Sequence, residues 1–153
     1  SRFMIVPVDA DGETGREIRV AGRQLFNFAV ADLDGSGTMK WVALATSSSR
    51  IGSTTALGIN SDGEELWSYN LPEGIHSTMV EQIVPARLPG GDSGWLFPGA
   101  DGSIHLLTSD GHPVERFNFG SRLTGLALGH WEGAPVLLIA GAGGLEAWKI
   151  ELD

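Results

Sequence analysis

Short apolar runs separated by turns rich in Gly and Asp recur along the whole chain. The clearest example runs from Phe28 to Ala45, where two apolar arms flank a bend of Asp, Gly and Ser residues at 32–37. Apolar arms of about four to eight residues that meet at such a bend are typical of a β-hairpin. No segment shows a convincing helical period of apolar residues, so the pattern predicts an all-β fold.

Two kinds of hairpin alternate along the chain. The first kind turns at Asp-Gly pairs that begin at residues 11, 62 and 110. Asp-Gly is favoured where both turn residues adopt positive φ, so we expect tight turns there. The second kind includes Phe28–Ala45 and recurs over residues 79–97 and 123–140. Together they form a repeating unit of roughly 42–51 residues that contains four strands.

The length of this unit predicts the blades of a β-propeller. With strands lettered A to D, the chain of 153 residues divides as a single repeat domain. Residues 1–24 form a partial blade of strands C and D, residues 25–74 and 75–120 form antiparallel four-stranded blades, and residues 121–153 form a partial blade of strands A to C. The alternative fold is a β-sandwich built from the same strands.

About three blades do not close a ring, because a propeller has at least about four. We therefore expect an open arc, an arc completed by self-association, or further blades outside this sequence. Unpaired edge strands favour pairing with another chain, which makes self-association an expectation. Because the sequence begins at Ser1-Arg2 inside a repeat, we also expect it to be a piece of a longer protein.

Two stretches resemble known propeller repeats. The stretch Phe28–Ala45, with its Ala-Asp-Leu-Asp-Gly-Ser-Gly motif, resembles the FG-GAP/VCBS repeat. The stretch Ala56–Leu71 is similar to the PQQ-type repeat, in which a turn precedes a docking tryptophan, here Trp67. The resemblance implies a propeller fold. It implies no quinone cofactor, since the quinone-dependent enzymes need a complete ring of blades and many proteins with PQQ-type repeats are non-catalytic scaffolds.

The loop from Asp32 to Lys40 is the candidate metal site. Calcium prefers several oxygen ligands, and alternate residues of a tight Gly-bearing loop aim their oxygens at one point. The candidate ligands are the carboxylates of Asp32 and Asp34, the Ser36 hydroxyl and the Thr38 carbonyl. FG-GAP-like loops carry an acidic residue at the ninth position, where this chain has Lys40. The alternative is that both carboxylates accept hydrogen bonds from backbone amides of the turn.

Two further features are candidate ligand sites. The polar loop that contains Ser48 and Arg50 is longer than its counterparts in the other repeats, and elaborated loops on a rigid scaffold commonly bind ligands. Trp131 lies at a turn, and an exposed aromatic ring could stack on a glycan. The other four tryptophans fall within or at the ends of the expected strands, where we expect them to be buried between sheets.

Composition excludes several classes of function. The net charge is −9 and the ten Lys and Arg residues are scattered, so nucleic-acid binding and docking on anionic membranes are not supported. The chain has no Cys, which excludes thiolate chemistry, and no apolar run approaches the ~18 residues of a membrane-spanning helix. The four His residues occupy different repeat positions, so we expect them on turns and strand surfaces rather than in a zinc site.

No catalytic constellation is found, since no Gly-x-Ser-x-Gly elbow is present. We therefore expect a non-catalytic recognition or scaffolding module that binds a protein partner, a neighbouring domain or another copy of itself. The alternatives are a module that binds a glycan or another ligand, and a fragment of a larger PQQ-like propeller enzyme. Calcium is the one cofactor considered, and the sequence indicates no compartment.

Overall fold

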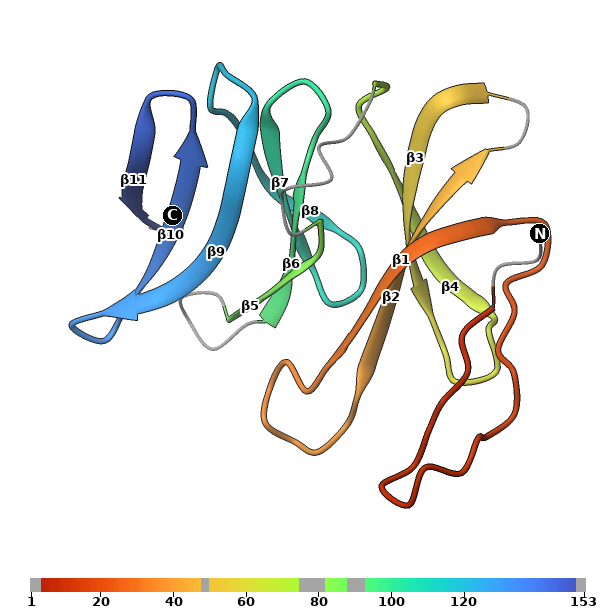
Figure 1. Ribbon diagram of the computed structural model, residues 1–153. Coiled ribbons are helices and arrows are strands. Elements are labelled where there is room, and N and C mark those ends of the chain that lie inside the picture. The colour runs from red at the N-terminus through yellow and green to blue at the C-terminus, as the bar shows by residue number, and fades with distance from the viewer. Residues whose placement is uncertain (1–3, 48–49, 75–81, 88–92, 151–153) are drawn as a thin grey trace.

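The computed structural model describes residues 4–47, 50–74, 82–87 and 93–150, and its regular structure there is entirely β-strand (Figure 1). The strands are β1 (Gln24–Ala31), β2 (Lys40–Ser47), β3 (Arg50–Ile59), β4 (Glu65–Leu71), β5 (Val84–Arg87), β6 (Ser93–Pro98), β7 (Ser103–Thr108), β8 (Pro113–Asn118), β9 (Leu123–Trp131), β10 (Ala134–Gly141) and β11 (Gly144–Lys149). None of the described residues forms a helix of the length and hydropathy needed to cross a bilayer.

The strands form three antiparallel sheets that stand side by side (Figure 1). The first sheet has the order β1-β2-β3-β4, the second β5-β6-β7-β8, and the third β11-β10-β9. Strands that follow one another in the sequence are therefore neighbours in each sheet. This is the blade-by-blade arrangement that the repeat predicts, and it differs from the alternative of a β-sandwich.

The N-terminal hairpin, residues 4–23, lies against the first sheet. It contains no strand, but backbone bridges join Ile5 to Ile18 and Val8 to Thr14. Ile5, Ile18 and Val20 are buried against residues of β1, β2 and β3. The N-terminal hairpin thus covers part of the face of the first sheet that points away from the second.

Alternation along the central strands explains how the sheets pack. In β2, Val42 and Leu44 face the second sheet, while Ala43 and Ala45 face the N-terminal hairpin. In a strand, successive side chains point to opposite faces, so a run that is apolar throughout needs cover on both sides. The first sheet has that cover.

The same alternation repeats in the second sheet. In β6, Trp95 and Phe97 pack against the first sheet, and Leu96 packs against the third. In the third sheet, Leu137 and Ile139 of β10 meet Leu96 in one buried cluster. The second sheet therefore presents one face to the first sheet and the opposite face to the third.

Trp67 of β4 joins the first two sheets. Its Nε1 donates a hydrogen bond of 3.1 Å to the carbonyl of Ser109, in the turn after β7. Its ring lies against Gly58 on one sheet and Gly111 on the other, so closely that a Cβ atom at Gly58 would lie 2.1 Å from Nε1. Only glycine at position 58 leaves room for this ring.

The Asp-Gly turns differ from the expected geometry. Gly12, Gly63 and Gly111 have φ near +85°, but the Asp before each of them does not have positive φ. A polar side chain three residues before each glycine closes the loop instead; Asn60, for example, accepts hydrogen bonds from the amides of Asp62 and Glu64. Among the described residues, positive φ at both turn positions is found at Glu132-Gly133, between β9 and β10.

The contact between Trp67 and Gly58 yields a stability prediction. We expect Gly58→Ala to lower the free energy of unfolding by about 2 kcal/mol or more, because the added methyl group forces the indole out of its site. Gly129→Ala, in β9, is the matched control: no atom lies within 4 Å of the Cβ it adds. Urea unfolding of both variants measures the difference, and equal stabilities would contradict the packing described for Trp67.

Candidate functional site

The third sheet has one buried face and one that the described residues leave uncovered. Leu126, Leu137 and Ile139 pack against the second sheet. The opposite side chains of the three strands belong to the other face, which we call the bare face. The bare face comprises Ala127, Trp131, Val136, Leu138, Leu145 and Ala147. Val136-Leu137-Leu138-Ile139 of β10 is as apolar as β2 or β6, yet only one side of it is packed.

The bare face is hollowed around Trp131. An open groove of about 800 Å³ is lined by Trp131, Val136, Leu138 and Ala147 of the bare face and by polar residues at its rim, His130, Glu132 and Lys149. The side chain of Trp131 is 71% exposed, and that of Leu145, on β11, is also 71% exposed. An apolar centre with large exposed side chains and a charged rim has the composition of a protein-binding surface.

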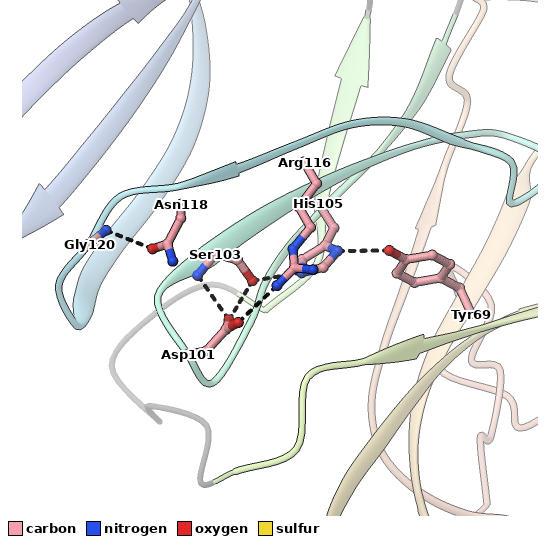
Figure 2. Close-up of polar contacts among 7 residues, drawn as sticks. All are labelled: Tyr69, Asp101, Ser103, His105, Arg116, Asn118 and Gly120. Carbon is pink, nitrogen blue, oxygen red and sulfur yellow. Dashed lines mark hydrogen bonds and ion pairs between the residues drawn. The ribbon is translucent and has the colours of Figure 1, made fainter.

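A chain of polar side chains links the first and second sheets (Figure 2). The hydroxyl of Tyr69, on β4, lies 2.9 Å from Nδ1 of His105, on β7. Nε2 of the same imidazole lies 2.7 Å from Oγ of Ser103. The Ser103 hydroxyl lies 2.5 Å from Oδ1 of Asp101, and Arg116 donates to Oδ2 of Asp101 at 3.0 Å.

The order of these contacts fixes where the protons lie. Asp101 accepts the hydroxyl proton of Ser103, so Oγ of Ser103 is left to accept a hydrogen bond from Nε2–H of His105. Nδ1 of His105 then accepts the hydroxyl proton of Tyr69. With His105 neutral, each of these side chains has a hydrogen-bond partner, as buried polar groups require.

These linked polar side chains do not have the arrangement of a nucleophilic triad. In a triad the carboxylate orients the histidine, and the histidine accepts the proton of the serine. Here the carboxylate of Asp101 accepts from the serine itself. Ser103 is 0% exposed and His105 is 2% exposed, so neither is open to a substrate. These hydrogen-bonded side chains therefore join two sheets rather than forming a reactive centre.

The pKa values follow from burial and from the two charges. Burial lowers the pKa of His105, and the Arg116 guanidinium lowers it further, against the opposing effect of Asp101. Burial raises the pKa of Asp101, but the hydrogen bonds from Ser103 and the charge of Arg116 outweigh it and lower that pKa overall. The neutral imidazole and the ionised carboxylate are thus the stable forms near pH 7.

The expectation that the histidines lie on turns and strand surfaces was wrong for His105. Its imidazole is buried at the interface between two sheets. Ser103 and His105 are two residues apart on one strand and so share a face, with Asp101 in the preceding turn. That spacing was visible in the sequence. The partner Tyr69 was not, because it comes from another sheet.

The loop of Asp32 and Asp34 closes on its own backbone. Asp32 accepts amide hydrogen bonds from Gly35 and Gly37 with its two oxygens, each at 2.9 Å, and Asp34 accepts from Ser36 at 3.0 Å. The Ser36 hydroxyl oxygen accepts from the Thr38 amide at 3.2 Å. The hydroxyl and amide of Ser36 lower the pKa of Asp34.

These contacts fit a self-closed turn better than a calcium site. Calcium takes roughly six to eight oxygen ligands, and this loop offers two carboxylates that already accept loop amides. Among the described residues, no group of three or more His, Cys, Asp or Glu side chains could hold a metal ion. Calcium binding at Asp32, Asp34, Ser36 and Thr38 stays a prediction.

The other predicted ligand residues do not form one site with Trp131. Ser48 lies outside the described residues, and Arg50 begins β3 of the first sheet. Trp131 ends β9 of the third sheet, and the second sheet stands between them (Figure 1). Sequence reasoning named Trp131 but missed the apolar face beside it, since Val136 and Leu138 read as ordinary core residues.

Comparison with known proteins identifies the fold. No protein-family model and no curated protein matches the chain. The chain is similar to BBS1N in a crystal structure of BBS1N in complex with ARL6DN, with a TM-score of 0.62 and 15% identity over 97% of this chain and 45% of that chain. It is also similar to BamB from Moraxella catarrhalis, with a TM-score of 0.52 and 19% identity over 96% of this chain and 38% of that chain.

A protein of unknown function from Bacteroides caccae gives a TM-score of 0.52 and 14% identity over 94% of this chain and 49% of that chain. The chain thus spans less than half the length of each of these three proteins. At such low identity the likeness shows the fold alone. The chain has an all-β, propeller-type fold of successive antiparallel blades.

The burial of His105 predicts a pH dependence of stability. Its pKa is lowered in the folded protein, so below the unfolded value of about 6.5 the unfolded chain binds more protons than the folded one. The free energy of unfolding should therefore fall as the pH drops through this range. Urea unfolding at about pH 7.5 and pH 5 should show a smaller fall for His105→Gln than for wild type. His130→Gln, at an exposed position, is the control; an unchanged fall in His105→Gln would contradict the account.

The Asp32 loop predicts how stability responds to calcium. We expect Asp32→Ala to lower the free energy of unfolding by about 1–3 kcal/mol, because two amides lose their acceptor. These hydrogen bonds need no ion. For the wild type, and likewise for the variant, we therefore expect the same melting temperature in calcium as in chelator. A rise in the melting temperature of wild type with calcium, absent in Asp32→Ala, would instead establish the calcium site.

Proposed function

We propose that the chain is a non-catalytic recognition module that binds a protein partner through the bare face. The observation that supports this most is the composition of β10, which is that of a strand buried on both sides although only one side is packed. In a repeat array, stacking neighbours bury the apolar faces of each unit. The bare face is apolar, so it has the composition of a surface that is covered by a partner.

The groove has an apolar floor, and its polar rim contains His130, Glu132 and Lys149. The buried Ser103 and His105 belong to the interface between the first two sheets. BBS1N, which shares the fold, has been crystallised in complex with a protein, ARL6DN. By analogy of fold, this supports a protein as the partner class.

We also propose that the repeats are of the FG-GAP/VCBS and PQQ-like types. The indole of Trp67 docks across to the turn of the next sheet, as the PQQ-type pattern implies. The Asp-rich turn joins β1 to β2 and buries Leu33 between the first two sheets, and this supports the FG-GAP assignment. An enzyme built on further blades is the competing function and would need a reactive site outside this chain.

A glycan is the second candidate ligand, because the exposed indole of Trp131 stands at the edge of the groove. Stacking of a sugar would depend on this ring alone. Protein binding would depend on the whole bare face. The two functions therefore differ in which substitution abolishes binding.

The test is site-specific photo-crosslinking in the cells from which the chain comes. With a photoreactive residue at Ala147, we expect one discrete protein adduct, and Leu138→Glu should lower its yield about tenfold or more because a charge enters the apolar contact. The same probe at Ser68, an exposed position on β4, is the control. Equal adducts at both positions would overturn the proposal. Binding on a glycan array that Trp131→Ala abolishes would support the glycan instead.

A further inference from the structure

We draw no further inference here: the strongest candidate, the small pocket between the second and third sheets that Phe117, Trp148 and Ile150 line, opens beside Ile150, where the described residues end, and nothing in the structure shows what covers it.

Discussion

The requirement that an apolar strand be covered on both faces controls this structure. β2, β6 and β10 are each apolar at consecutive positions, and alternation sends half of their side chains to each side of the sheet. One sheet cannot satisfy this alone. The second sheet packs between the other two, and the second sheet and the N-terminal hairpin cover the two faces of the first. At about 25 cal/mol per Å² of buried apolar area, these interfaces supply the main stabilising free energy. The order of the sheets along the chain is a consequence of this requirement.

Hydrophobic packing is non-directional, and polar contacts from β4 fix how the first two sheets meet. Trp67 donates to the Ser109 carbonyl, and Tyr69 bonds to His105. Both side chains project from one strand at alternate positions, so they lie on the same face and reach into the second sheet together. A shift of one residue in the register of β4 would turn both away and leave His105 buried without a partner. These contacts therefore select a single arrangement from the many that packing alone allows.

Local pattern was sufficient to predict the strands of the three sheets, and insufficient for features that depend on contacts between sheets. The two strands expected within residues 1–24 are wrong, because only isolated backbone bridges form among residues 4–23. The hairpins flanking residues 32–37 and Gly133 follow from apolar runs and turn residues, and the structure has them. The Asp-Gly turns were assigned the wrong conformation, because Asp9 and Asn60 close the loops with side-chain acceptors that a dipeptide rule ignores. His105 was misplaced because its burial depends on Tyr69, 36 residues earlier in the chain. Long-range pairing of this kind leaves no local periodicity to detect.

The bare face was missed for a related reason. In sequence, Val136 and Leu138 cannot be distinguished from Leu137 and Ile139, since all four have the composition of a core strand. Only the packing shows that one pair is covered by the second sheet and the other is not. A surface built to the same pattern as an internal interface should bind by the same rule, through shape and apolar area, with its polar rim setting orientation. The proposed binding surface and the covered faces of the sheets thus have the same apolar composition, and they differ only in whether another sheet packs against them.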